Sequence, residues 1–285
     1  MRTDRKRAPV AALVAAAVLA ACVLAGPGLP LRSAAAGDGK DLPQVTVVVR
    51  DGQAEAPRAV PTGLVAITFE NRSAVPYTGA FLQLNPGVSA ATFGAAIASE
   101  GFAAFRRLVA GSPGGPAFVA PGESRVLVVE FGPGTYLLTS TGQDGPPSVL
   151  AAIEAMPPLV GDVPPVTQGT VVMGDFFFQT PAIAAGTSTI ALTNRGQQPH
   201  HMLIFRLAPG VTVQQALTAE AQGEDPLEAG LLMPATGVET MSPGQTVYPT
   251  LTFTPGTYAM VCFVQDPATG LPHAALGMVE EFTVR

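Results

Sequence analysis

Cysteine is almost absent from this 285-residue sequence, which contains only Cys22 and Cys262. Cys22 lies in an N-terminal stretch that is typical of a targeting segment, so the remainder holds one cysteine and cannot form an internal disulfide. A lone thiol in an exported protein is open to oxidation, and metal binding is one reason to keep it. The alternative is that Cys262 is a small buried apolar residue.

Histidine and charged side chains are also scarce. The three histidines are His200, His201 and His273, and charged residues make up 13% of the sequence. Residues 1–36 hold five of the 15 basic residues and one of the 21 acidic ones, which leaves the rest with a formal charge of −10. This balance provides no phosphate-binding surface, so we expect no nucleic-acid partner. An acidic surface would suit a basic protein partner.

The first 36 residues predict export, to the cell surface, the periplasm or the medium. A basic start is followed by an uncharged run, Ala8–Leu31, and three interpretations compete. Leu19–Cys22 resembles the lipobox of bacterial lipoproteins, and Ala34–Ala36 resembles a signal-peptidase site. The uncharged run is also long enough to remain as a membrane anchor. Membrane association is therefore one of the expected outcomes, and release is the other.

The sequence is rich in glycine and proline, with 31 and 28 residues, and it repeats itself. Ile67–Arg72 matches Ile190–Arg195 at an offset of 123 residues, and Phe131–Tyr136 matches Phe253–Tyr258 at an offset of 122. Ordered matches of this kind predict two related units. We place them at residues 42–156 and 169–285, joined by a proline-rich linker at residues 157–168.

Short β-rich runs bounded by turn residues dominate both units, so the sequence predicts an all-β fold with a small β-sandwich in each. In the first unit the runs are Val45–Val49, Val65–Phe69, Ala80–Leu84, Arg125–Phe131 and Thr135–Ser140. In the second they are Thr170–Phe178, Thr189–Thr193, Met202–Leu207, Thr246–Phe253, Thr257–Phe263 and Met278–Val284. Each unit also has a short helical insertion, at Ser89–Ala110 in the first and at Thr212–Ala221, resuming over Pro226–Leu232, in the second.

Four residues of the second unit form a candidate metal site. His200 opens a strand, Cys262 closes one, His273 follows a ten-residue loop, and Met278 opens the last strand. Strand ends at one pole of a sandwich can meet. A thiolate with two imidazoles and a weak thioether suits copper that cycles between Cu(I) and Cu(II), whereas zinc more often takes further cysteine or histidine ligands.

The sequence resembles the cupredoxins, or blue copper proteins. The resemblance rests on three segments, Asn194 to Pro199-His200, Pro255-Gly256-Thr257-Tyr258 to Cys262, and His273 to Met278. It implies two tandem Greek-key β-sandwich domains and one type 1 copper ion in the second. The implied ligands are His200, Cys262, His273 and Met278, with His201 as an alternative to His200. The ten-residue loop between Cys262 and His273 is longer than in small cupredoxins.

The first unit serves as an internal control because it keeps the turns and strands but not the ligands. Tyr77 stands for His200, Thr78 for His201, Ser140 for Cys262, Ser148 for His273 and Ile153 for Met278. The scaffold therefore does not need histidine, cysteine or methionine at these positions for packing. Asn194 is retained as Asn71, which favours a structural role. Phe176–Phe178 favours a buried strand over a docking surface.

The resemblance favours a one-electron carrier with a redox partner protein, in which His273 forms the exposed edge of the site. Copper storage or delivery, and a metal-free cupredoxin-like extracellular interaction module, are the alternatives. Further copper centres of the kind that oxidases and nitrite reductases use need more histidines, and none is left. On this ground the sequence predicts that the protein is not an enzyme.

Overall fold

The computed structural model describes residues 42–285 except 101, 141–147 and 161–162. The predicted targeting segment at residues 1–36 lies outside the described residues, so its three interpretations stay predictions. Among the helices of the described part, none is long and apolar enough to cross a bilayer.

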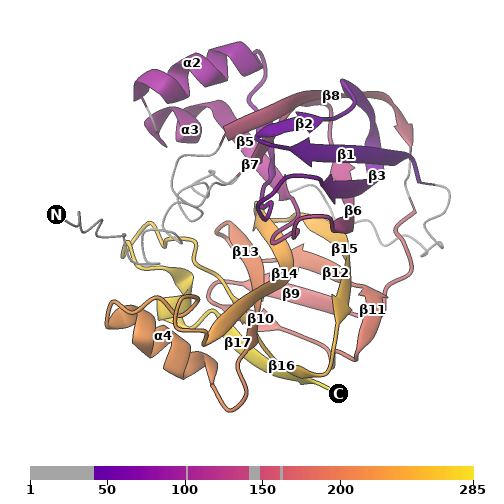
Figure 1. Ribbon diagram of the computed structural model, residues 1–285. Coiled ribbons are helices and arrows are strands. Elements are labelled where there is room, and N and C mark those ends of the chain that lie inside the picture. Colours follow the sequence, from indigo (N-terminus) through magenta and orange to yellow (C-terminus); the bar gives the residue numbers. More distant parts are fainter. Residues whose placement is uncertain (1–41, 101, 141–147, 161–162) are drawn as a thin grey trace.

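Strands make up most of the described chain (Figure 1). In the first half these elements are β1 Gln44–Arg50, β2 Gln53–Glu55, β3 Ala59–Asn71, β4 Phe81–Leu84, α2 Ala90–Glu100, α3 Phe102–Leu108, β5 Val109–Gly114, β6 Ser124–Phe131, β7 Gly134–Ser140 and β8 Ser148–Val160. In the second half they are β9 Thr170–Gly174, β10 Phe177–Gln179, β11 Gly186–Thr189, β12 Ala191–Asn194, β13 His200–Leu207, α4 Val213–Ala221, β14 Leu232–Met241, β15 Thr246–Phe253, β16 Gly256–Val261, the 3₁₀ turn η2 His273–Leu276 and β17 Val279–Val284.

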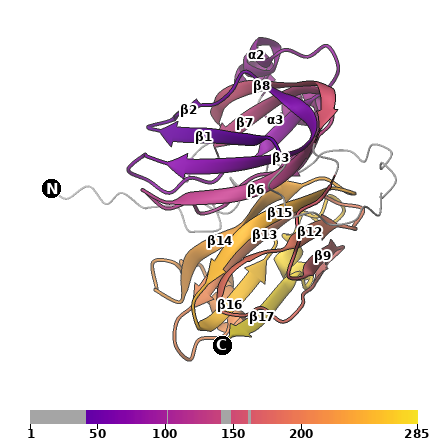
Figure 2. The ribbon, with the colours of Figure 1, turned by 90° about the vertical axis from the view of Figure 1, so that its right-hand side faces the viewer.

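The strands form two layers that run through both halves (Figure 2). One layer has the order β2-β1-β3-β6-β15-β12-β9-β10, and the other has the order β8-β7-β4-β5-β14-β13-β16-β17. In each half the first long pairing is parallel, β1 with β3 and β9 with β12. The predicted all-β, cupredoxin-like sandwich class is confirmed by this arrangement.

The two halves join through pairs of corresponding residues. Leu127 of β6 lies opposite Pro249 of β15, and Pro116 forms a bridge with Val238. Both pairs are 122 residues apart, the same offset that relates the matching segments of the sequence. Each half therefore presents the same two strand edges to the other, which protects edges that would otherwise lie open.

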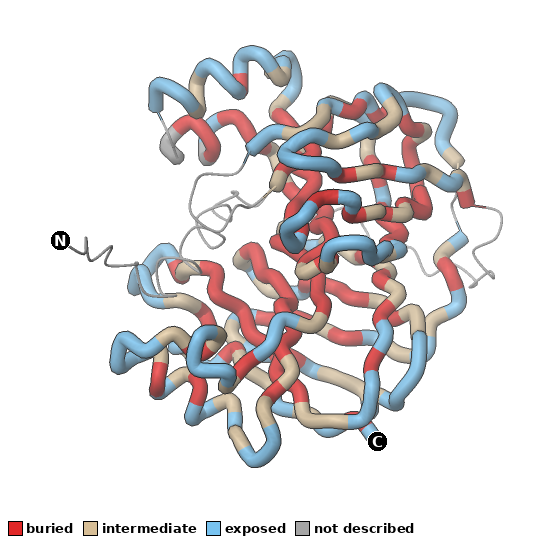
Figure 3. Tube along the Cα trace, in the orientation of Figure 1, coloured by how far each residue is buried: buried red, intermediate tan, exposed pale blue. Residues whose placement is uncertain are grey.

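Alternating side chains build the core. In β15 every second residue is buried, and Val247, Leu251 and Phe253 point inward. Figure 3 shows that buried residues follow the strands of both halves, while exposed ones lie on helices and loops. A sheet with one face on the core and one in solvent produces this period of two. Helix α4 begins with a capping box, in which Thr212 and Gln215 satisfy each other's backbone N–H groups.

Several elements differ from the prediction. Thr170–Phe178 is not one strand, because the chain turns at Asp175 and Phe176 and pairs β10 back onto β9. Over Pro226–Leu232 no helix forms, because residues 226–230 are in turns and Leu232 begins β14. The predicted helix Ser89–Ala110 corresponds to two helices, α2 and α3, and its last two residues belong to β5. Strand β8 runs through Val160, four residues into the predicted linker.

Strands β5 and β14 were not predicted because their signals are tertiary. Val109–Gly114 contains two glycines and a proline, which are poor strand formers. It becomes extended because it pairs with β4 on one side and touches β14 on the other. Partners far away in the sequence thus override its local preference.

Candidate metal centre

Three elements bring the candidate ligands to one end of the second half. His200 is the first residue of β13, and Cys262 directly follows β16, the neighbouring strand. His273 begins the 3₁₀ turn η2 after the loop. Because β13 and β16 pair antiparallel, the start of one and the end of the other share an edge.

The three side chains converge in the buried interior. His200 Nδ1 lies 3.0 Å from His273 Nδ1, and Cys262 Sγ lies 3.9 Å and 3.5 Å from these two nitrogens. All three residues have no exposed surface. Metal–nitrogen and metal–thiolate bonds measure roughly 2.0–2.3 Å, so one ion can reach all three atoms. The cluster can therefore hold a single metal ion.

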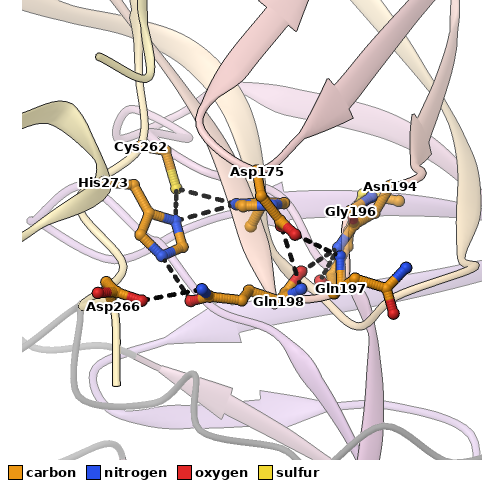
Figure 4. Close-up of polar contacts among 10 residues, drawn as sticks. Asp175, Asn194, Gly196, Gln197, Gln198, Cys262, Asp266 and His273 are labelled. Atoms are coloured by element: carbon orange, nitrogen blue, oxygen red, sulfur yellow. Dashed lines mark hydrogen bonds and ion pairs between the residues drawn. The ribbon is translucent and has the colours of Figure 1, made fainter. Parts of the chain in front are cut away.

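Hydrogen bonds on the outer sides of the two rings fix their tautomers. His200 Nε2 lies 2.8 Å from Asp175 Oδ1. His273 Nε2 lies 3.0 Å from Gln198 Oε1 (Figure 4). Burial alone would raise the pKa of Asp175, but N–H groups of Gln197 and Gln198 and the His200 ring together lower it. The carboxylate can only accept, so His200 carries its hydrogen on Nε2.

Both Nδ1 atoms are consequently bare. Burial lowers the pKa of His200, and burial followed by the nearby His200 charge lowers the pKa of His273 to about 4. Two neutral rings with hydrogens on their outer nitrogens direct lone pairs at each other and at the Cys262 sulfur. The Cys262 thiol can donate its one hydrogen to only one of these nitrogens, so the other lone pair lacks a donor. Imidazole nitrogens held by acceptors on their far side are typical of metal ligands.

Gly196 makes room for the outer bond of His200. A Cβ added there would collide with Asp175 Oδ1 and lie 2.6 Å from His200 Nε2. Its backbone N–H donates to Asn194 Oδ1 at 2.9 Å, which holds the loop in place. Sequence reasoning missed Asp175, Gln198 and Gly196. An acidic residue inside the apolar run of residues 170–178 was the available signal.

His201 faces away from the cluster. Its Nε2 accepts the backbone N–H of Phe263 at 2.7 Å, and its ring packs against the Phe263 ring with centroids 6.2 Å apart. Adjacent residues of a strand point to opposite faces, which separates His201 from His200. The structure thus places His200 in the cluster, and His201, the predicted alternative, outside it.

Cys262 lies in the interior with no exposed surface. Burial raises the pKa of the Cys262 thiol to about 12, and Glu239 adds to the rise, while backbone N–H groups of His201 and Val264 oppose it. A metal bound here has to displace the thiol proton. The two backbone N–H groups then remain as hydrogen-bond donors to the sulfur.

Met278 is fully buried beside the other candidates. Its N–H donates to His273 O at 2.9 Å, and its carbonyl accepts the Cys262 N–H at 3.2 Å. Gly277, with φ +108°, turns the chain back between η2 and β17. A non-glycine residue is strained at this φ, so glycine sustains the spacing of His273 and Met278. The role of Met278 as a metal ligand stays a prediction.

The expectation that His273 forms the exposed edge of the site is wrong. Its exposure is 0%, because Gln198 covers Nε2 and the Phe176 ring packs edge-on against it with centroids 5.0 Å apart. Phe176 reaches His273 because it occupies the β9–β10 turn. The predicted buried strand at Phe176–Phe178 is only partly present: Phe177 and Phe178 belong to β10 and Phe178 is buried, but Phe176 lies in the turn and Phe177 is 50% exposed.

Comparison with known proteins yields distant structural matches. No protein-family model matches the sequence, and neither does any curated protein. A reduced auracyanin from the photosynthetic bacterium Roseiflexus castenholzii is 22% identical, with a TM-score of 0.29, over 42% of this chain and 98% of that chain. A multicopper oxidase is 16% identical, with a TM-score of 0.24, over 94% and 96%. A copper-containing nitrite reductase from Thermus scotoductus SA-01 is 12% identical, with a TM-score of 0.23, over 85% and 61%.

These matches correct the prediction that the protein is not an enzyme. Two of the similar structures, the oxidase and the reductase, are enzymes. The histidine count argued only against further copper centres of known types. A fold that enzymes share gives no ground for excluding catalysis.

The described part of the chain therefore combines a cupredoxin-like fold with a buried His200–Cys262–His273 cluster that can bind copper.

Proposed function

We propose that this protein is an exported copper protein that exchanges single electrons through one type 1 copper ion, with His200, Cys262, His273 and Met278 as ligands. The observation that carries the proposal is the set of two bare Nδ1 atoms and one sulfur, 3.0–3.9 Å apart in a buried space. The single hydrogen of the Cys262 thiol can serve only one of the two nitrogens, whereas a cation is attracted by all three atoms. The outer acceptors keep it in place before any metal arrives.

The donor set favours copper over other common metals. One thiolate, two imidazoles and a distant thioether form the ligand set of blue copper sites, whereas structural zinc prefers four strong ligands. The bound ion supplies one-electron exchange between Cu(I) and Cu(II). The protein's contribution is a rigid, dry pocket, since the ligands are buried and three of their backbones hydrogen-bond one another.

Electrons would cross the side chains that cover His273 rather than its own edge. Phe176 contacts the ring, and the exposed apolar residues Phe177 and Leu271 belong to the segments on either side of the site. The chain beyond residue 36 carries a formal charge of −10. A redox protein with a basic surface fits this combination. The basic, then uncharged, N-terminus supports export, with or without a membrane anchor.

The test is to express the chain, purify its exported form, add Cu(II) and record the visible spectrum. We expect intense blue absorption with one copper per chain, and its loss in Cys262→Ser. The adjacent histidines provide a matched pair, because His200→Gln should abolish the absorption and His201→Gln should keep it. A wild-type protein that stays colourless would refute the proposal.

Measuring the reduction potential of the copper-loaded protein distinguishes electron transfer from copper storage or delivery. Fast, reversible one-electron reduction of the blue protein supports electron transfer. Copper that binds but cannot be reduced reversibly points to storage or delivery instead.

A further inference from the structure

The outer edge of His273 is held by a chain of three side chains. His273 Nε2 meets Gln198 Oε1 at 3.0 Å, and Gln198 Nε2 donates to Asp266 Oδ1 at 2.9 Å (Figure 4). Asp266 Oδ2 accepts the N–H and O–H of Thr269 at 2.9 Å and 2.7 Å. These contacts connect the loop before β13 with the loop between Cys262 and His273.

Asp266 fixes the direction of the hydrogen bonds from Gln198 to His273. Thr269 and Gln198 hydrogen bonds lower the pKa of Asp266, so its carboxylate is ionised and accepts only. The Gln198 amide must therefore turn its NH₂ toward Asp266 and its oxygen toward His273. An oxygen at that position requires a hydrogen on His273 Nε2, which leaves Nδ1 bare and aimed at Cys262.

Backbone hydrogen bonds hold the long loop between Cys262 and His273 in a compact conformation around Asp266. Asp266 N donates to Leu271 O at 2.9 Å, and Gly270 N donates to Asp266 O at 2.8 Å. Gln265 and Pro272 form a β-bridge across the base of the loop. Asp266 is consequently 4% exposed although it lies in a surface loop. The additional loop length thus places one carboxylate beside Gln198.

The first half shows that Gln198 is not needed for its own loop. Asn71 Nδ2 donates to Val75 O at 2.8 Å, and Asn194 Nδ2 donates to Gln198 O at 2.9 Å, so Val75 and Gln198 occupy equivalent places. Val75 is 64% exposed and has no histidine beside it to hold. The contact with the asparagine uses the backbone oxygen of Val75 or Gln198 and not the side chain. The Gln198 side chain is free for another task.

We propose that Gln198 and Asp266 are positioning residues that clamp His273, fix its ring for the metal and close the site to solvent. The consequence for bound copper rests on the proposed function, but the clamp itself exists in the metal-free protein. Without it the His273 ring can rotate and admit water. Loss of an outer partner of a ligating histidine typically costs about 10- to 100-fold in metal affinity.

The first experiment uses metal-free, ¹⁵N-histidine-labelled full chain and NMR. The Nε2–H signals of His200 and His273 should both be visible and slow to exchange. In Gln198→Val we expect the His273 signal to be lost to exchange while the His200 signal, bonded to Asp175, remains and shows that the variant is folded. The control is Gln197→Val, whose exposed side chain points away from the site in Figure 4 and which should keep both signals.

The second experiment measures copper removal by a chelator. Gln198→Val should lose copper at least about tenfold faster than wild type, and Gln197→Val at the wild-type rate. Asp266→Ala should accelerate copper loss from the wild-type protein, but in a protein that already carries Gln198→Val it should do so by less than about twofold, because Asp266 acts on His273 through Gln198. If Asp266→Ala accelerates copper loss equally in both proteins, Asp266 does not act through Gln198 and the proposed clamp is overturned.

The two proposals fail differently. A His273 Nε2–H signal that persists in Gln198→Val refutes the clamp whether or not copper binds. If the wild type takes up no copper, the proposed function fails, and the NMR result still decides the clamp.

Discussion

The loops around Asn71 and Asn194 share a set of asparagine hydrogen bonds but carry different side chains at equivalent positions. Each asparagine donates to the carbonyl four residues ahead, at Val75 or Gln198, and to a second carbonyl on a distant segment. Each also accepts the N–H two residues ahead, from Ser73 or Gly196.

Within these matching frames the neighbouring residues differ. Tyr77 fills the place of His200 and donates its O–H to Thr139 O at 2.8 Å, whereas His200 faces Cys262 and His273. One backbone frame thus supports a first half without these side chains and a second half with the His200–Cys262–His273 cluster. The difference lies in a few side chains and in the space that glycine leaves at position 196.

Exchanging a ligand for its first-half counterpart should have the largest effect. His200→Tyr replaces a buried imidazole with a phenol that lacks a nitrogen donor, so we expect copper affinity to fall by more than about 100-fold, beyond the usual cost of an outer partner. Competition titration with a chelator measures this change. Tyr77→Phe in the first half should leave the affinity within about twofold. Blue absorption retained in His200→Tyr would contradict the comparison.

Removing either asparagine should destabilise the protein to a similar extent but affect copper unequally. Both side chains are buried, and both make the same three hydrogen bonds, to which Asn71 adds a fourth from the Ser73 hydroxyl. Each substitution by alanine should therefore cost about 2–4 kcal/mol in free energy of unfolding. Urea unfolding of the metal-free protein measures this loss. Only Asn194→Ala should also weaken copper binding, because its loop carries Gln198 and leads into His200. Equal losses of copper affinity would mean that the first half supports the site.

Glu239 of the second half should make the stability of the protein depend on pH. Its counterpart 122 residues earlier is Ala117, which has no group to titrate. Burial raises the pKa of Glu239 to about 7, and its Oε1 has no hydrogen-bond partner among the described residues. The folded state therefore binds this proton more tightly than the unfolded state does. The resulting stability is complete below pH 4.5 and is lost as the pH rises through 7.

The size of this loss is on the order of 2–3 kcal/mol. Urea unfolding of the wild type at pH 5 and at pH 8 should show this fall in the free energy of unfolding. In Glu239→Gln the fall between the two pH values should be smaller by the same amount. Identical pH dependence in the two proteins would show that Glu239 ionises as freely in the fold as in the unfolded chain.

The smallest effect is expected at the residue that differs inside the matching loops. Gly196→Ser should push Asp175 off His200, lower copper affinity about tenfold and cost about 1–2 kcal/mol in stability. The reverse change, Ser73→Gly, removes a hydroxyl that donates to Asn71 Oδ1 at 2.6 Å. It should cost about 1 kcal/mol and leave copper binding unchanged. Equilibrium unfolding and copper titration of both variants test the pair, and a tenfold effect of Ser73→Gly on copper would contradict it.

Much of the fold could be predicted because its signals are local. Runs such as Thr246–Phe253 alternate in polarity and became strands. The matching segments at offsets of 122 and 123 residues indicated where related elements begin and end. Strand β5 and the turn at Asp175 were missed, since pairing with distant strands decided the first and packing against His273 favoured the second.

The sequence by itself determined which residue types were available for a metal. The one cysteine beyond residue 36, three histidines and their spacing to Met278 limited the site to a small set, and the first half, which lacks these residues, showed that packing did not require them. Tertiary structure decided which histidine joins Cys262 and that His273 is covered. It also placed Asp175 in a hydrogen bond to His200, and Gln198, held by Asp266, in a hydrogen bond to His273. Those choices depend on three separate segments meeting at one end of a sandwich, and no local pattern encodes the distances between them.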